Sequence, residues 1–231
     1  INELLSNLYS DSSHFIFELL QNAEDAKAKN VKFSLTSKEC RIWHDGIDFT
    51  FDDVNSITSI HKSTKVNDFT QIGEHGVGFK SVLSITKSPI IRSGGVEFEI
   101  KYIVLPEILN SNYNGQNTEI ILPLNRDDLN AEQVSLNIYQ RIARLGFRNI
   151  LFLNNIQKIE WKYGERYGCY TKKSQKKYKG HLNVTRRTII YTTNAFQDDI
   201  NADPQVSEEN YLVFSGKKKD LHPSINFSNI H

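Results

Sequence analysis

Three glycines with the spacing G-x-x-G-x-G are the residues of this sequence with the clearest chemical use. They are Gly73, Gly76 and Gly78, and Phe79-Lys80-Ser81 follows them directly. Because glycine has no Cβ, a backbone of this composition can approach a ligand closely. Residues 79–85 can begin a helix, whose unpaired N-terminal amides and positive dipole end favour an anion. The segment predicts a phosphate-binding loop, and the simpler interpretation is a glycine-rich surface turn.

A carboxylate and a carboxamide come together in the segment 15–26, whose apolar residues follow helical spacing. Glu18 and Asn22 are four residues apart, so they share a helix face beside the apolar stripe. A glutamate can act as general base for a water, and the side-chain oxygen of asparagine suits Mg²⁺, which takes few protein ligands besides phosphate oxygens. The pair predicts a hydrolytic site, and the simpler interpretation is a solvated helix face.

Five segments, taken in order, resemble the motifs of the GHKL ATPases, the superfamily of gyrase, heat-shock chaperones, histidine kinases and MutL. Residues 18–26 resemble its N-box, 44–50 its base-reading loop, 59–65 its ATP lid, 73–81 its phosphate loop and 117–122 its adenine-contacting strand. Residues 76–86 and 151–161 look most like sacsin-type, chaperone-related domains. The resemblance covers residues 5–165 and implies that the chain binds ATP and Mg²⁺.

The resemblance also implies a role for individual residues. Glu18 would polarise the attacking water, Asn22 would hold Mg²⁺, and Thr118 would help to hold adenine. Asp25 would brace the base-reading loop or simply favour the first helical turns, while Lys80 would add a cation or point away from the site. The residues expected to contact nucleotide are Asn22, Asp25, His44, Asp45, Gly46, Lys62, Ser63, Thr64, Gly73, Gly76, Val77, Gly78, Phe79, Lys80 and Thr118.

The base-reading loop departs from the family pattern D-x-G-x-G. Alignment on Gly46 puts His44 at the position of the family Asp and Asp48 at the second glycine. A neutral imidazole nitrogen can accept a hydrogen bond from the exocyclic amine of adenine, as a carboxylate does. We therefore expect His44 to face the pocket and Asp45 to support the loop, with Asp45 as the alternative reader of the amine.

Residue patterns and the resemblance together predict an α+β fold of the Bergerat type, a helix layer on a mixed, mostly antiparallel sheet. Helical spacing covers residues 1–29 and 127–145, and strand patterns cover 31–35, 40–43, 90–92, 98–103, 118–124, 150–163, 182–193 and 211–214. Residues 1–165 would form the ATP-binding domain. Residues 166–231 would form a β-rich extension continuing from it, with 194–210 as a loop.

Composition sets limits on location and partners. The 231 residues, 39% of them hydrophobic, are enough for one substantial core. A formal charge of +1 gives no overall attraction to nucleic acid or to an anionic membrane, and no long apolar run predicts a membrane span. Two cysteines do not make a disulfide framework, so we expect a cytoplasmic protein. The first residue, Ile1, and the absence of methionine predict a fragment of a larger protein.

The expected function is that of a Mg-dependent, slow ATPase domain that works as a conformational switch of chaperone-like or defence type. Its partners would be ATP and a protein or other domains of the same larger protein. One alternative is a nucleotide-gated nucleic-acid clamp, and another is an ATP sensor without turnover. The clamp would use a basic cluster with interleaved tyrosines, for which a solvated hairpin tip is the simpler interpretation. This cluster comprises Tyr170, Lys172, Lys173, Lys176, Lys177, Tyr178 and Lys179.

Overall fold

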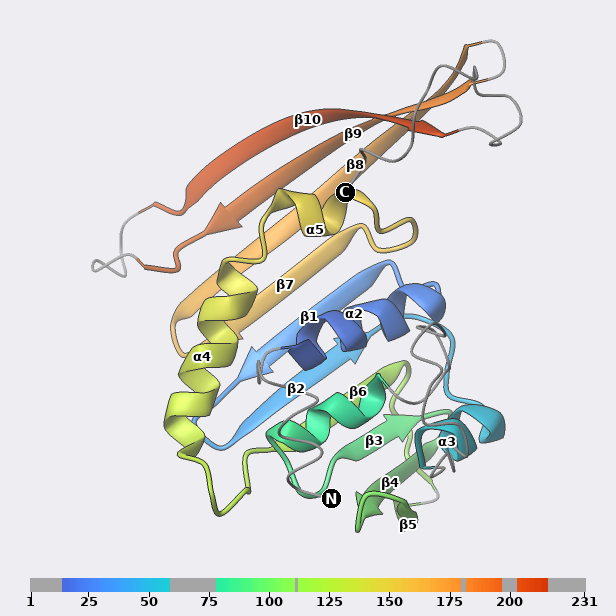
Figure 1. Ribbon diagram of the computed structural model, residues 1–231, viewed down its shortest axis with the longest axis vertical. Coiled ribbons are helices and arrows are strands. Elements are labelled where there is room, and N and C mark those ends of the chain that lie inside the picture. Colours follow the sequence, from blue (N-terminus) through green and yellow to red (C-terminus); the bar gives the residue numbers. More distant parts are fainter. Residues whose placement is uncertain (1–13, 59–77, 111, 180–181, 197–202, 216–231) are drawn as a thin grey trace, which may run out of the picture.

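Alternating burial along the strands explains which residues form the sheet and its core. The structure is a computed structural model that describes residues 14–58, 78–110, 112–179, 182–196 and 203–215 (Figure 1). Strands β1 (Asn30–Leu35) and β2 (Glu39–His44) bury every second side chain and pair as an antiparallel hairpin. Such alternation is typical of strands that face the core on one side only.

The described strands form one mixed sheet of ten strands. The others are β3 (Ile90–Ser93), β4 (Val96–Lys101), β5 (Leu105–Asn110), β6 (Thr118–Pro123), β7 (Lys158–Tyr163), β8 (Arg166–Lys179), β9 (Leu182–Thr193) and β10 (Gln205–Ser215). Their order across the sheet is β10-β9-β8-β7-β1-β2-β6-β3-β4-β5. Among these described neighbours, β1 and β7 run parallel and the remaining pairs are antiparallel.

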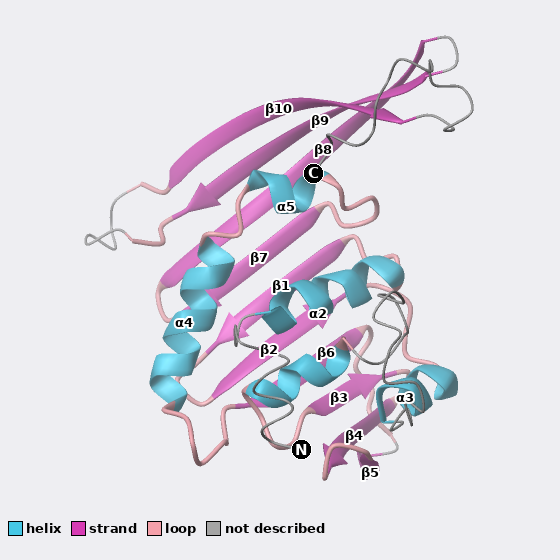
Figure 2. Cartoon of the chain, in the orientation of Figure 1, coloured by secondary structure: helices cyan, strands magenta, loops and turns pink. Residues whose placement is uncertain are grey.

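Helices cover one face of this sheet, as Figure 2 shows. They are α2 (His14–Asp25), α3 (Phe51–Thr58), α4 (Ala131–Ala143), α5 (Phe147–Leu151) and the 3₁₀ helix η1 (Phe79–Ser84). Helix α2 buries its apolar stripe, which includes Phe15, Leu19 and Ala23, and α4 buries Ile138 and Ile142. The predicted α+β class, a helix layer on a mixed and mostly antiparallel sheet, is confirmed. No helix of the described ranges is long and apolar enough to cross a membrane.

Two predicted segments differ from the structure at one end. The predicted strand 150–163 is wrong at its start, because Gly146, at φ +79°, turns the chain into α5 before β7 begins. The predicted loop 194–210 is wrong at its end, because pairing with β9 draws residues from Gln205 onward into β10 despite their polar composition. Residues 79–84 form a 3₁₀ helix, in which the hydroxyl of Ser81 bonds Gly78 O at 2.6 Å. Residues 1–13 of the predicted N-terminal helix lie outside the described residues.

The extension continues the same sheet, because β8 pairs with β7 along its first residues. In Figure 1 the orange and red strands β8, β9 and β10 run on past the helix layer. Tyr170 and Lys172, at 2% and 4% exposure, point into the core. Tyr170 stacks on Tyr191, with ring centroids 4.6 Å apart, and its hydroxyl accepts a hydrogen bond from Gly146 N. These two residues of the basic cluster are therefore core residues and do not belong to a solvated tip or a nucleic-acid surface.

Candidate functional site

A cavity of about 230 Å³ lies where the C-terminal half of α2 meets the connection between β2 and α3. We call it the α2–α3 cavity, and it is lined by Asn22, Asp25, Ala26, Ile47, Asp48, Phe49, Asp53, Ser56, Ile57 and Phe79. Helix α3 is fixed at its start by reciprocal bonds: Thr50 N donates to Asp53 Oδ2 at 2.7 Å, and Asp53 N donates to Thr50 Oγ1 at 3.2 Å. This capping box orients the α3 side of the cavity.

The loop after β2 is docked tightly onto the end of α2. A Cβ on Gly46 would lie 2.7 Å from Ala26 O, so only glycine allows this approach. Ile47 N donates to Ala26 O at 2.8 Å. Asp45 Oδ1 accepts bonds from Lys29 N and Asn30 N, at 2.7 and 2.8 Å. Asp45 thus braces the loop, and it is not among the described residues that line the cavity.

His44 lies on the core face of β2 and is 2% exposed. Burial lowers its pKa to about 4, although Asp45 and Asp48 act in the opposite direction. Its Nδ1 accepts a hydrogen bond from Gly46 N at 3.2 Å. The proton of the neutral ring therefore lies on Nε2, which is a donor and cannot accept a bond from an amine. His44 is also not among the described residues that line the cavity.

Asp48 is the carboxylate that this loop brings to the cavity, and it belongs to a chain of hydroxyl groups. Its Oδ1 accepts a hydrogen bond from Ser93 Oγ at 3.3 Å, and Ser93 Oγ lies 2.7 Å from Thr118 Oγ1. Phe49 N also donates to Ser93 Oγ, at 2.9 Å. Since Ser93 has one proton, and it goes to Asp48, the proton between the two hydroxyls comes from Thr118. Thr118 is fully buried and reaches the cavity through this chain.

Sequence reasoning missed Asp48 and Ser93 as site residues. Asp48 stands at the place of a family glycine, and Ser93 reads only as the start of a turn. The alternation of β2 could have predicted that His44 is buried. Cys40 and Ile42 are core residues two positions apart, and His44 is the next residue in that series.

Asn22 and Asp25 bring polar groups of α2 to the cavity. Asp25 accepts a hydrogen bond from Gln21 Nε2 at 2.9 Å. It is the last residue of α2, so its charge cannot favour the first turn of that helix. No three His, Cys, Asp or Glu side chains of the described ranges gather into a metal-binding cluster. The side-chain oxygen of Asn22, a partly buried residue that lines the cavity, fits Mg²⁺, because this ion can take most of its ligands from phosphates and water.

Glu18 lies one helical turn before Asn22, against the start of η1. A Cβ on Gly78 would overlap the Glu18 carboxylate, so the two residues are in direct contact. Glu18 Oε1 also lies 3.6 Å from His14 Nδ1, and its side chain is 31% exposed. Lys80 is half-buried, and burial lowers the pKa of its ammonium group. Phe79 is buried and forms part of the cavity wall.

The structure therefore brings Glu18, Asn22, Asp25, Gly78 and Phe79 into one region, with Thr118 linked to it. Four other predicted contact residues are described but do not line the cavity: His44, Asp45, Gly46 and Lys80. The remaining predicted contact residues lie outside the described residues: Lys62, Ser63, Thr64, Gly73, Gly76 and Val77.

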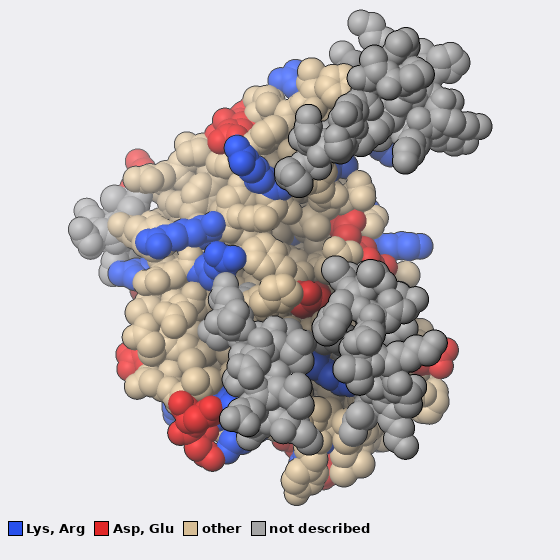
Figure 3. All heavy atoms as spheres, in the orientation of Figure 1, with Lys and Arg blue, Asp and Glu red and all other residues tan. Residues whose placement is uncertain are grey.

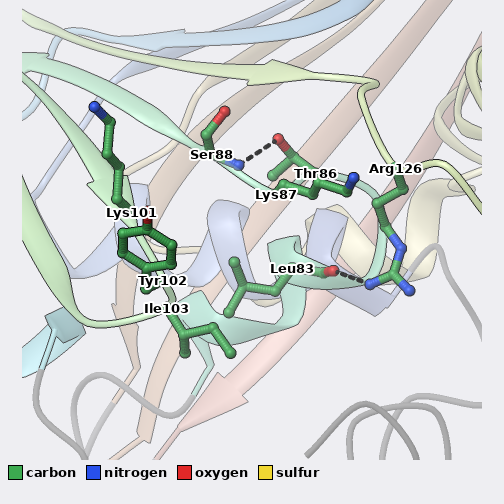
Figure 4. Close-up of a pocket in the computed structure, with 8 residues that line it drawn as sticks. All are labelled: Leu83, Thr86, Lys87, Ser88, Lys101, Tyr102, Ile103 and Arg126. Carbon is green, nitrogen blue, oxygen red and sulfur yellow. Dashed lines mark hydrogen bonds between the residues drawn. The ribbon is translucent and has the colours of Figure 1, made fainter.

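A second cavity, of about 400 Å³, lies at the other end of η1 (Figure 4). It is lined by Leu83, Thr86, Lys87, Ser88, Lys101, Tyr102, Ile103 and Arg126. Arg126 donates to Leu83 O at 2.8 Å, which ties the end of η1 to this wall. The three basic residues that line this cavity are each paired with an acidic side chain. The pairs are Lys87 with Asp127, Lys101 with Glu107 and Arg126 with Asp128. None of the predicted nucleotide contacts lies among the described residues that line it.

Comparison with known proteins shows several relatives. The family model described as histidine kinase-, DNA gyrase B- and HSP90-like ATPase matches residues 9–134. Protein NO VEIN of Arabidopsis thaliana is 31% identical over 188 residues, covering 69% of this chain and 7% of that protein. Sacsin of Homo sapiens is 34% identical over 105 residues, covering 38% of this chain and 2% of that protein. The crystal structure of the N-terminal domain of a DNA repair protein aligns with a TM-score of 0.47 and 11% identity, covering 80% of this chain and 69% of that one.

Proposed function

Because the chain belongs to the family of histidine kinase-, DNA gyrase B- and HSP90-like ATPases, we propose that it binds ATP in the α2–α3 cavity and hydrolyses it slowly. The observation that carries this proposal is the arrangement on α2. Glu18 contacts Gly78, which directly precedes η1, while Asn22, one turn later, lines the cavity. A general base and a metal ligand thus lie on one rigid helix beside a segment with the phosphate-loop motif.

In this mechanism Glu18 accepts a proton from the water that attacks the γ-phosphorus, while the bond to the β,γ-bridging oxygen breaks to give ADP and phosphate. Asn22 holds Mg²⁺ through its side-chain oxygen, and the ion, when bound, offsets the negative charge of the phosphates. The amides at the start of η1 contribute hydrogen bonds to the same phosphates. We expect turnover in the isolated domain to be slow, with a cation for the γ-phosphate supplied by another domain of the larger protein.

We assign adenine recognition to Asp48 in place of His44. Its carboxylate accepts a bond from the exocyclic amine, and the bonds from Thr118 to Ser93 and from Ser93 to Asp48 hold it in place. Guanine presents a carbonyl oxygen at that position, which the carboxylate repels. Asp48 is therefore the base-selective residue of the cavity.

The assignment is tested by calorimetric titration with ATP and GTP in the presence of Mg²⁺. Wild type is expected to prefer ATP by about 10-fold or more, as for a hydrogen bond to a charged group. Asp48→Asn, whose amide can also donate to guanine, should lose this preference, whereas the exposed control Asp52→Asn should keep it. No preference in wild type, or a preference lost in His44→Gln and kept in Asp48→Asn, would contradict the assignment.

The domain acts as a nucleotide-driven switch within a larger, cytoplasmic protein of chaperone-like or defence type. Its small share of NO VEIN and sacsin supports the view that other domains receive the signal. The free thiols of Cys40 and Cys169 suit a reducing compartment.

The nucleic-acid clamp is less well supported. Two of its expected contacts, Tyr170 and Lys172, are buried. On the face shown in Figure 3, basic and acidic side chains of the described residues are interspersed. Nucleic-acid binding usually relies on a patch or stripe of one sign.

A further inference from the structure

The connection between α5 and β7 is held on one side by a single carboxylate of α2. Glu24, in the last turn of that helix, is 8% exposed. It accepts bonds from the N–H groups of Asn154, Asn155 and Ile156, at 2.7, 2.8 and 3.0 Å. Burial raises the pKa of Glu24, but the bonds from Ile156, Asn155 and Asn154 outweigh burial and hold the pKa below its usual value. Glu24 is therefore a charged anchor for three consecutive amides.

Two cations of the extension hold the same connection from its other side. Arg187 of β9 donates through Nη1 to Leu151 O and through Nη2 to Asn154 Oδ1, the latter at 3.0 Å. Lys172 of β8 donates through Nζ to Leu153 O. We call residues 151–156 the coupling loop. Its amides face α2, and its carbonyl groups are bound by β8 and β9.

The three charged groups around the coupling loop depend on one another. Burial and, after it, the charge of Arg187 lower the pKa of Lys172 to about 8, and burial lowers the pKa of Arg187, whereas the charge of Glu24 raises both. Glu24 is buried and each cation offsets part of its charge, so removing Lys172 or Arg187 leaves this carboxylate with less compensation, which is unfavourable. A change in β8 or β9 therefore alters the charge compensation of Glu24.

Glu24 can pass such a change to the site because it shares a helix with the site residues. Glu18, Asn22 and Glu24 all lie within α2, a single helix of 12 residues. The connection between α2 and β1 is tied to the residue that follows the coupling loop, since Gln157 N donates to Lys29 O at 2.8 Å. A shift of the coupling loop therefore moves the end of α2, and the helix carries that shift to Asn22 and Glu18.

Building on the ATPase function proposed above, we propose that β8 and β9 control ATP turnover through the coupling loop. Glu24, Lys172 and Arg187 are positioning residues, which act on the reaction through α2 and do not touch the nucleotide. A domain or partner that engages the extension would thereby set the place of Glu18. By reciprocity, nucleotide binding at α2 must change the stability of the coupling loop.

The test uses two pairs of matched variants. Lys172→Met removes the bond to Leu153 O and keeps the side-chain length, and Lys173→Met is its control on the same strand, since Lys173 is exposed. Arg187→Gln removes the bonds to Leu151 and Asn154, and Arg186→Gln is its exposed control, which bonds Asn210. For each protein, amide exchange in residues 18–26, ATP turnover and thermal unfolding are measured.

Lys172→Met and Arg187→Gln are expected to speed amide exchange in residues 18–26 and to reduce turnover at saturating ATP, each by about 2- to 30-fold. Both controls should match wild type. Arg187→Lys, which keeps a cation, should recover part of the turnover. Wild-type exchange and turnover in folded Lys172→Met and Arg187→Gln would overturn the proposal, since a purely structural role changes only the unfolding temperature.

A measurement on wild type alone serves if those variants fail to fold. ATP with Mg²⁺ should slow amide exchange at Asn154, Asn155 and Ile156. If ATP with Mg²⁺ slows exchange at residues 22–26 but leaves exchange at these three amides unchanged, the coupling is overturned. A wild type that binds ATP without turnover would contradict the ATPase function separately, because the exchange measurements then still decide whether the loop couples β8 and β9 to α2.

Discussion

Glu18 and Gly78 are in direct contact where α2 meets the start of η1. A Cβ on residue 78 would overlap Glu18 Oε2 and lie 3.0 Å from Glu18 Cδ. Besides the phosphate contact proposed for this backbone, the glycine leaves room for the proposed general base. The overlapping atom is the far end of a flexible side chain, so a substitution would displace the carboxylate and leave the fold intact.

We expect Gly78→Ala to lower ATP turnover by about 10-fold or more, because a catalytic group displaced by about 1 Å can lose this much. The free energy of unfolding should change little. Steady-state kinetics and denaturant unfolding measure the two effects. Wild-type turnover in Gly78→Ala would show that Glu18 does not need this contact.

Gly46→Ala should behave in the opposite way. Its Cβ would lie 2.7 Å from Ala26 O and 2.9 Å from Ala26 Cβ, groups that belong to the end of α2 and cannot rotate away. We expect a loss of about 1–3 kcal/mol in the free energy of unfolding, as for other overpacked sites. Urea unfolding at neutral pH measures it, and a loss below about 0.5 kcal/mol would mean that the loop shifts freely, because such small changes are typical of surface positions.

The buried imidazole of His44 should make stability depend on pH. Its pKa falls from 6.5 to about 4 on folding. Between these values the unfolded state binds more protons, so the free energy of unfolding rises as pH rises from about 4 to 6.5 and then levels off. Over this range His44 changes the free energy of unfolding by roughly 3 kcal/mol, and acidification from pH 6.5 to 4 removes this stability.

His44→Asn should reduce this pH dependence, since asparagine can still accept the bond from Gly46 N. His14→Gln, at an exposed position, is the control for removal of a histidine. Unfolding curves at a series of pH values provide the measurement. An unchanged slope between pH 4 and 6.5 in His44→Asn would show that His44 is protonated in the folded protein.

Local patterns predicted the parts of the fold whose partners are close in sequence. The hairpin of β1 and β2 follows from alternation, and the turn between β3 and β4 follows from Gly94 and Gly95, whose φ angles are +58° and +82°. Helix α5 and the start of β10 did not follow, because packing of Ile150 and pairing with β9 override local propensity.

The site was harder to predict where a residue's role depends on distant contacts. The spacing of Glu18 and Asn22 on one helix face was visible in the sequence. The burial of Glu24 was not, because its partners lie about 130 residues later, at Asn154 and Ile156. The position of Asp48 at the cavity depends on the path of a loop packed on Ala26, which no spacing rule describes.

The central claim is that α2 carries a general base and a metal ligand with separate functions. Glu18→Ala should bind ATP nearly as wild type does and lose hydrolysis, because a general base acts on the water and makes little contact with the ground state. Asn22→Ala should weaken ATP binding when Mg²⁺ is present and have little effect without it. Calorimetric titration of both variants with ATP, with and without Mg²⁺, alongside phosphate release, measures this directly. Equal affinities in the two variants under both conditions, or full hydrolysis in Glu18→Ala, would contradict the account.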